Sequence, residues 1–182
     1  MTIKPGDNIL FMKVGTHASE ELSEIIDRKR AEIDAEGFAF WGYGGNTCHP
    51  ATVVQPFAMG STGPIVLAMR PMVSKHFAEP VRAEEYSHDG IDWRPVPEGI
   101  NCKGSRYALL IDSLDEVDDL VDLSRTRVAV GPSRGKVGAS YIRGRVDKAC
   151  LEVTDEPAGD PTIVEIKLRA NLIKPYAVFL RN

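Results

Sequence analysis

The segment from residue 125 to residue 148 has the residue types that bind phosphate groups. It contains seven basic residues and a single acidic one. If residues 141–153 form a strand, alternate side chains share a face, and this places one aromatic ring beside two guanidinium groups. The preceding loop adds two cations between glycines, where the backbone can approach a phosphate closely. Cations beside an aromatic ring are typical of surfaces that bind nucleotides or single-stranded nucleic acid.

We therefore predict that this basic loop and strand bind a phosphate-bearing ligand, either a nucleotide or a nucleic acid. The predicted ligand-binding residues of the segment are Arg134, Lys136, Tyr141, Arg143 and Arg145. The alternative is an ordinary solvated strand face whose arginines pair with acidic residues elsewhere in the chain.

Two loops near the amino terminus offer a second place for chemistry. Free amides at a helix start and in glycine-rich backbone bind phosphate or carboxylate, so Thr16 and Asn46 join the predicted ligand-binding residues. Cys48 with His17 as its base has the residue types of an activated thiol, which predicts a cysteine-dependent hydrolase or transferase as the alternative function. His49 is a poor base for its neighbour, because adjacent strand residues point to opposite sides.

Simpler interpretations of these two loops stay open. Their glycines serve equally well in tight turns, and a free cysteine packs like a small apolar residue. The histidines and cysteines have no regular ligand spacing, so no metal site is predicted, and the sequence indicates no particular cofactor.

The elements that must position these loops are a strand, a helix and a second strand. Residues 8–14 are an apolar run of strand length, and residues 38–43 are a short aromatic run. Between them, apolar residues at steps of three and four predict a helix that ends near Gly37. A helix of about 18 residues rises about 27 Å, enough to return the chain along the first strand. We expect the two strands to be parallel, with both loops at one edge of the sheet.

The rest of the chain is predicted to be mostly strands. Apolar or alternating runs predict strands over residues 51–57, 64–70, 106–111, 127–130, 141–153, 162–169 and 176–180. The segment around residues 164–169 alternates apolar and charged side chains, as a half-exposed antiparallel strand does. Residues 71–105 are rich in proline and glycine and are predicted to be a long irregular excursion.

An acidic segment predicts a second helix and a third function. Residues 113–116 (SLDE) have the pattern of a capping box, and the apolar residues after them recur at helical spacing. The opposite face of this helix would carry four aspartates, which predicts a surface for a protein partner as another alternative. An ordinary solvated face explains the same pattern. The aspartates of the predicted partner surface are Asp115, Asp118, Asp119 and Asp122.

Composition limits these interpretations. A chain of 182 residues, 43% hydrophobic and 26% charged, fits one soluble domain. The three cysteines lie far apart and are odd in number, so we expect reduced thiols rather than disulfides. Apolar runs fall short of the roughly 20 residues that cross a membrane, and the first residues lack a secretion signal. We therefore expect a cytoplasmic protein without a membrane partner.

The net charge of -4 conceals an uneven distribution along the chain. Residues 1–122 carry a net charge of -9, and residues 123–182 carry +5, so the acidic total does not exclude an anionic ligand. Taken together, the patterns predict a single α+β domain over residues 1–182, with a βαβ start, a predominantly antiparallel sheet and two main helices. The sheet is either open or curled into a barrel.

Overall fold

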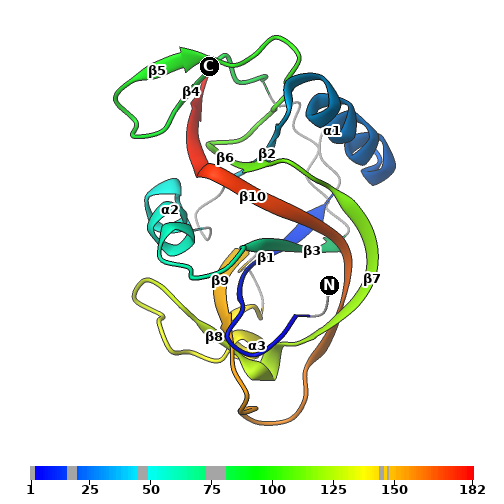
Figure 1. Ribbon diagram of the computed structural model, residues 1–182, viewed down its shortest axis with the longest axis vertical. Coiled ribbons are helices and arrows are strands. Elements are labelled where there is room, and N and C mark those ends of the chain that lie inside the picture. Colours follow the sequence, from blue (N-terminus) through cyan, green and yellow to red (C-terminus); the bar gives the residue numbers. More distant parts are fainter. Residues whose placement is uncertain (1–2, 16–19, 45–48, 73–80, 144–145, 147) are drawn as a thin grey trace.

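The computed structural model describes residues 3–15, 20–44, 49–72, 81–143, 146 and 148–182, and it shows a mixed α/β fold (Figure 1). The strands in these residues are β1 (Asn8–Gly15), β2 (Ala39–Tyr43), β3 (Val66–Met72), β4 (Glu85–Ser87), β5 (Trp93–Pro95), β6 (Tyr107–Ile111), β7 (Asp115–Asp122), β8 (Thr126–Val128), β9 (Lys148–Val153) and β10 (Ile163–Arg181). The helices are α1 (Leu22–Glu36), α2 (Ala51–Met59), α3 (Gly138–Tyr141) and the 3-10 turn η1 (Leu123–Arg125). Within this part of the chain, no helix combines the length and apolarity needed to span a membrane.

The long strand β10 joins the two halves of the sheet. The strand order is β2-β6-β10-β3-β1-β9-β8, and β10 also pairs with β7 and β4. A bulge between Leu172 and Ala177 interrupts its register with β6, and Tyr176 has a φ of 71° there. The strand bends at this place, as bulged strands do (Figure 1). In the described residues β2 and β8 do not pair with each other, so the sheet is open and a closed barrel is not supported.

The strand β1 lies inside the sheet and is covered on both faces. Its residues from Ile9 to Met12 are each at most 2% exposed, which explains why this apolar run does not alternate with polar residues. One edge of β1 pairs in parallel with β3, and the other edge pairs antiparallel with β9. The strands predicted at residues 8–14 and 38–43 are confirmed, but the expected pairing between them is wrong. Because both edges of β1 are occupied, β2 pairs antiparallel with β6 instead.

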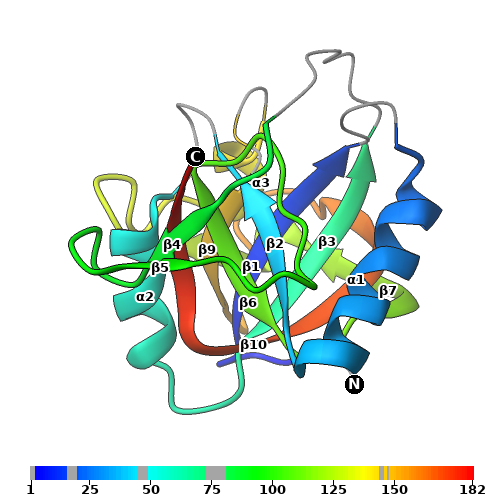
Figure 2. The same ribbon diagram turned by 90° about the horizontal axis from the view of Figure 1, so that it is seen from above.

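The parallel partner of β1 is therefore β3, which the chain reaches only after α1, β2 and α2. Ile9 lies opposite Val66, and the register continues to Gly15 opposite Met72. The carboxyl ends of β1 and β3 consequently lie side by side, and β2 points to the same side of the molecule (Figure 2). A sheet edge with parallel strand ends therefore exists, as the sequence predicted, but the strand beside β1 is β3 and not β2.

Helix α2 stands where the sequence predicted a strand over residues 51–57. Its buried residues Ala51, Val54, Phe57 and Ala58 recur at helical spacing, which is the stronger signal. The β-branched residues between them suggested a strand, but they lie on a helix that packs against the sheet. In the described residues α1 and α2 are the two long helices, so the predicted number of main helices is right, although one of the two predicted positions is wrong.

Strand β7 stands where the sequence predicted the acidic helix. It pairs antiparallel with β10, and Val121 is buried opposite Val164, while Leu120 is 66% exposed. Helical spacing was therefore misleading here. The backbone ladder with β10 and the burial of Val121 make this segment a strand. Cross-strand ion pairs accompany it, since Asp118 binds Lys167 at 2.6 Å and Asp119 pairs with Arg169.

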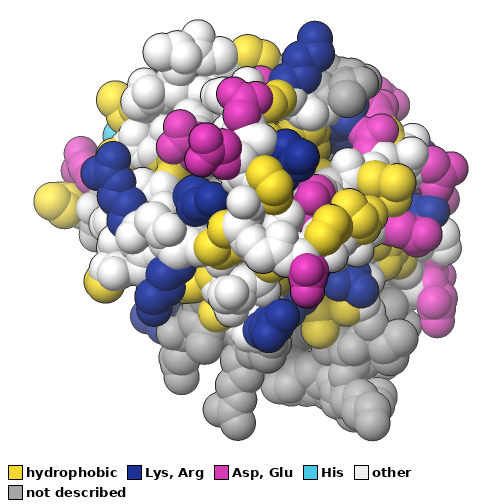
Figure 3. All heavy atoms as spheres, turned by 90° about the horizontal axis from the view of Figure 1, so that it is seen from below, with side chains coloured by type: hydrophobic (Ala, Val, Ile, Leu, Met, Phe, Trp, Pro, Cys, Tyr) yellow, Lys and Arg dark blue, Asp and Glu magenta, His cyan; other side chains and the backbone are white. Residues whose placement is uncertain are grey.

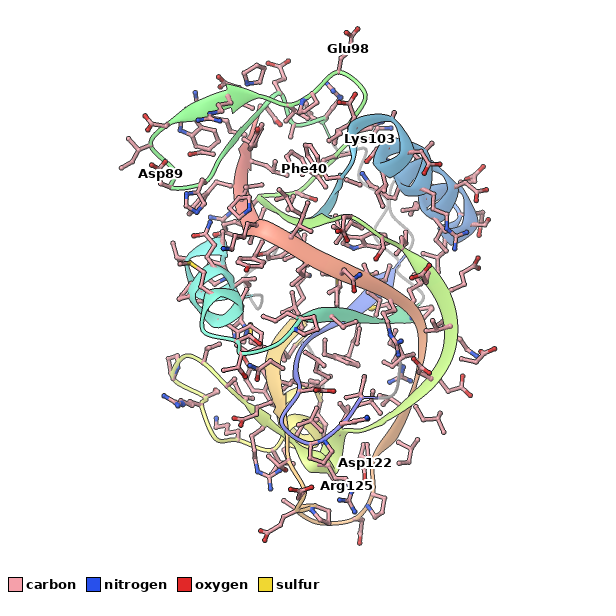
Figure 4. The ribbon with its side chains drawn as sticks, viewed as in Figure 1. Phe40, Asp89, Glu98, Lys103, Asp122 and Arg125 are labelled. Atoms are coloured by element: carbon pink, nitrogen blue, oxygen red, sulfur yellow. The ribbon has the colours of Figure 1, made fainter. Side chains whose placement is uncertain are left out.

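The irregular segment predicted at residues 71–105 contains a short hairpin of β4 and β5. Residues 73–80 lie outside the described part of the chain. At the turn between the two strands, the Asp89 carboxylate accepts hydrogen bonds from the amides of Asp92 and Ile91 and from the Ser87 hydroxyl (Figure 4). These hydrogen bonds, the one from Asp92 first, lower the pKa of Asp89 from 3.8 to about 2.

We expect the Asp89 carboxyl to titrate with a midpoint of about 2. Because its folded pKa lies below its unfolded value, it stabilises the hairpin fully above about pH 4, and this contribution is lost as the pH falls towards 2. An NMR titration of the side-chain carboxyl carbons measures the midpoint directly. A midpoint near 3.8 would show that the turn does not hold the carboxylate.

A buried ion pair fixes α1 to the loop before β6. Lys29 and Glu32 are 4% and 3% exposed, and Lys29 Nζ lies 2.7 Å from Glu32 Oε2. Lys29 also donates to the Asn101 carbonyl at 2.7 Å, and Glu32 accepts from the Asn101 amide at 3.0 Å. Burial lowers the pKa of Lys29, and the neighbouring Glu32 opposes that effect. Helix α1 ends as predicted at Gly37, which has a φ of 82° and donates its amide to Ile33.

Replacing only one member of this pair should destabilise the protein strongly. The variant Lys29→Met leaves the Glu32 carboxylate buried without its cation, and we expect the free energy of unfolding to fall by about 3 kcal/mol. The double variant Lys29→Met with Glu32→Leu should recover most of that loss. Urea denaturation measures each value. The matched control is Lys167→Met, whose solvent-exposed pair with Asp118 should contribute little to stability; equal losses for both lysines would refute this account.

Candidate functional site

Several residues that the sequence marked for chemistry lie outside the described part of the chain. They are Thr16, His17, Asn46, Cys48 and Arg145. The predicted cysteine nucleophile and its histidine base therefore stay predictions. The other two cysteines, Cys102 and Cys150, are free and buried, as expected for reduced thiols, and burial raises the pKa of both.

Tyr141 and Arg143 do not lie on the strand that the sequence predicted over residues 141–153. Tyr141 is the last residue of α3, and Arg143 comes two residues later. Among the described residues of this range, the strand β9 begins at Lys148. A small residue allows the helix to pack closely. Gly138 approaches Thr126 so closely that a Cβ at this position would clash with its hydroxyl, so α3 packs tightly against β8 and η1.

Four other basic residues of the segment from 125 to 148 fall into two groups. Arg134 and Lys136 are exposed on a tight loop with positive φ at two glycines, and neither forms an ion pair with a described residue. This loop projects beside α2, away from the ends of β1 and β3 (Figures 1 and 2). Arg125 and Arg127 instead donate to backbone carbonyls, and this fixes their positions. The accepting carbonyls are those of Ser124, Thr126, Asp155 and Glu156.

The four aspartates of the predicted partner surface lie on β7 and no longer share one helical face. Asp118 and Asp119 pair with cations of β10, and Asp122 accepts from the amides of Ser124 and Thr162 at 3.0 and 2.9 Å. Burial opposes ionisation of Asp122, but these hydrogen bonds leave its pKa lowered. On the end of the molecule that carries Asp122 and Arg125, described acidic and basic side chains intermingle (Figures 3 and 4).

A group of cations gathers where β1 and β3 end. Lys13 on β1 lies opposite Arg70 on β3, and the two side chains share the sheet face of Phe11 and Ala68. Lys13 Nζ donates to the carbonyl of Ile142 at 2.9 Å, and this holds the end of α3 against the strand end. Arg143 is the next residue, and Arg70 and Arg143 are both exposed and form no ion pair with any described residue.

The ring of Tyr141, two residues before Arg143 in the chain, stacks on an imidazole. The His49 and Tyr141 ring centroids are 6.1 Å apart at an angle of 22°, and Tyr141 Oη lies 3.2 Å from His49 Nε2. His49 Nδ1 accepts from the backbone amide of Cys150 at 3.3 Å. The imidazole thereby occupies the edge of β9 next to the place where β8 ends. We call Lys13, His49, Arg70, Tyr141 and Arg143 the strand-end cluster.

The electrostatics of the strand-end cluster favour an anion. Burial lowers the pKa of His49, so its ring is neutral at neutral pH, and desolvation raises the pKa of Tyr141, so its phenol keeps its proton. The fixed charges of the cluster are then all positive. Among the described residues, no group of three or more His, Cys, Asp or Glu side chains could hold a metal ion.

Lys13 and Arg70 were not predicted as site residues, although the sequence contains a signal for them. Each is the single cation near the end of an apolar strand run, at residues 8–14 and 64–70. Two buried parallel strands place such residues next to each other, but this inference needs the correct partner of β1. His49 was considered only as a base for Cys48, and its contact with Tyr141 joins residues 92 positions apart.

The fold and site define a mixed α/β protein with an open sheet and a basic, aromatic cluster at the strand ends. Comparisons with models of known protein families, with curated proteins and with solved structures give no match. The functional argument therefore depends on the residues themselves.

The neutral state of His49 should make stability depend on pH. Its folded pKa lies below its ordinary value of 6.5, so its contribution to stability is present above about pH 6.5 and is lost as the pH falls below that value. We expect the free energy of unfolding, measured in urea, to fall between pH 7 and pH 5. The variant His49→Gln should lack this part of the decrease, whereas His88→Gln, at an exposed turn, should keep it. Identical pH profiles for wild type and His49→Gln would contradict the assignment.

Proposed function

We propose that the protein binds a phosphate-bearing ligand, a nucleotide or a single-stranded nucleic acid, at the strand-end cluster. The observation that carries this proposal is the convergence of Lys13, Arg70 and the end of α3 on one face of the sheet. Arginine forms paired hydrogen bonds with phosphate oxygens, and two arginines here have no ion pair with a described residue.

The aromatic part of the cluster supports a ligand that also carries a base. The Tyr141 ring is partly exposed and is held in place by its stack on His49. A fixed and partly exposed ring offers a stacking surface, and base stacking on an aromatic side chain contributes about 1–3 kcal/mol. Tyr141 thus offers a surface for the base two residues before Arg143, one of the cations proposed to bind the phosphate.

The location differs in part from the one expected from sequence. Tyr141 and Arg143 stay in the proposed site, and Lys13 and Arg70 join them from the sheet. Arg134 and Lys136 lie on the loop beside α2, so they serve as a separate, secondary contact for a longer ligand such as a nucleic acid.

Removing the two exposed arginines should weaken binding of a fluorescently labelled single-stranded oligonucleotide. For the variant Arg70→Ala with Arg143→Ala we expect the dissociation constant to rise at least about 10-fold, because two charged hydrogen-bonding groups are lost. Wild-type binding should weaken steeply with added salt. For the variant, the plot of log affinity against log salt concentration should be shallower by the amount that about two lost phosphate contacts produce. Fluorescence anisotropy at several salt concentrations measures both quantities.

The matched control removes the same charge from a different surface. Arg94→Ala with Lys174→Ala takes away two exposed cations of β5 and β10 and should leave the affinity nearly unchanged. A third variant, Arg134→Ala with Lys136→Ala, should weaken oligonucleotide binding less than the cluster variant does. Wild-type binding that is absent or insensitive to salt would refute the proposed function.

A further inference from the structure

The hydrogen bonds of His49 determine which of its ring nitrogens carries the proton. A backbone amide can only donate, and the Cys150 amide nitrogen lies 3.3 Å from His49 Nδ1. Nδ1 therefore presents a lone pair and carries no hydrogen. In the neutral ring the proton is then on Nε2, which lies 3.2 Å from Tyr141 Oη. It follows that His49 donates and the Tyr141 hydroxyl accepts.

This arrangement leaves the Tyr141 hydroxyl with a hydrogen that must point elsewhere. A phenol has one hydrogen to donate, and His49 cannot receive it because Nε2 already carries a proton. In the described part of the chain the Tyr141 side chain has no other hydrogen-bond partner. Because the residue is only partly buried, the hydroxyl hydrogen is available to a bound molecule.

We infer that Tyr141 donates a hydrogen bond from Oη to an anionic oxygen of the ligand's phosphate group, and that His49 is the positioning residue that fixes this direction. The inference rests on the proposed function and deepens it. The carbonyl of the following residue, Ile142, is held by Lys13, and Arg143 comes next, so one short segment presents a neutral donor beside the cations.

The same geometry restricts the class of ligand. A phosphate oxygen accepts hydrogen bonds from a hydroxyl and from a guanidinium at the same time. A cationic group such as an ammonium would instead meet the positive charge of the cluster, which disfavours it. The site therefore favours an oxyanion with accepting oxygens.

Titration with adenosine monophosphate, inorganic phosphate and adenosine tests the inference on the full chain. The variant Tyr141→Phe keeps the ring and its stack but lacks the donor. We expect its affinity for adenosine monophosphate and for inorganic phosphate to fall about 10-fold, as is usual for a hydrogen bond to a charged group. Affinity for adenosine should not change. The control Tyr86→Phe, on β4, should bind all three as wild type does.

The two phosphate probes distinguish the sources of the phosphate. Tighter binding of adenosine monophosphate than of inorganic phosphate supports a nucleotide, and equal binding of the two overturns the contribution of the base. Nitrogen-15 chemical shifts of the His49 ring report its tautomer without any ligand. A proton on Nε2 is expected, and a proton on Nδ1 would overturn the inference.

Failure of the inference and failure of the proposed function give different results. If Tyr141→Phe binds both phosphate probes as wild type does, while Arg70→Ala with Arg143→Ala loses binding, the hydroxyl donor is wrong and the phosphate site stands. If the wild type binds neither phosphate probe nor the oligonucleotide, the proposed function is refuted and the inference with it.

Discussion

The backbone hydrogen bonds of β10 hold together parts of the chain that otherwise have little contact. Its first residues pair with β7, its middle pairs with β3, and its last residues pair with β6 and β4. Each buried backbone group that loses its partner costs about 1–3 kcal/mol. Without β10, β3 would lose one neighbour and β6 would keep only β2, so neither half of the sheet would be complete. The bend near Tyr176 allows a single strand to serve both halves.

The charge asymmetry of the sequence is partly cancelled by this same strand. Asp118 and Asp119, from the acidic part of the chain, meet Lys167 and Arg169 of β10. Exposed pairs of this kind contribute little to stability, but they neutralise the long edge strand β7. Acidic side chains also protect an edge strand from pairing with other chains. The positive charge at Arg70 and Arg143 is not neutralised by described residues, and the proposed binding of an anion at the strand ends depends on it.

The sequence predicted most elements whose signal is local. The apolar run of β1, the helix α1 with its Gly37 end, and the alternating part of β10 were all recognised. Elements whose form depends on distant partners were missed. Residues 113–122 have helical spacing and a capping box, yet pairing with residues some 50 positions later makes them a strand. At residues 51–57 the burial of one helical face outweighs the preference of β-branched residues for strands.

The candidate site was also predicted only in part, because its residues come together through pairings between distant strands. The strand-end location followed from a correct idea, parallel strands ending at one edge, but with β2 in the place of β3. Tyr141 and Arg143 were identified from their residue types, whereas their position at the end of α3 depends on the close contact of Gly138 with Thr126. Lys13 and Arg70 become neighbours only when the register of β1 and β3 is known.

The position of β10 in the chain also affects how the protein can be made. Residues 163–181 enter the centre of the sheet between β3 and β6, so during synthesis these two earlier strands lack their central neighbour until residues 163–181 have left the ribosome. Pairings that join distant parts of a sequence form slowly, because the chain must first close long loops. Meanwhile the apolar strands β3 and β6 each have an exposed edge, which favours aggregation. The nascent chain is therefore expected to depend on chaperones more than a protein of similar size built from local contacts.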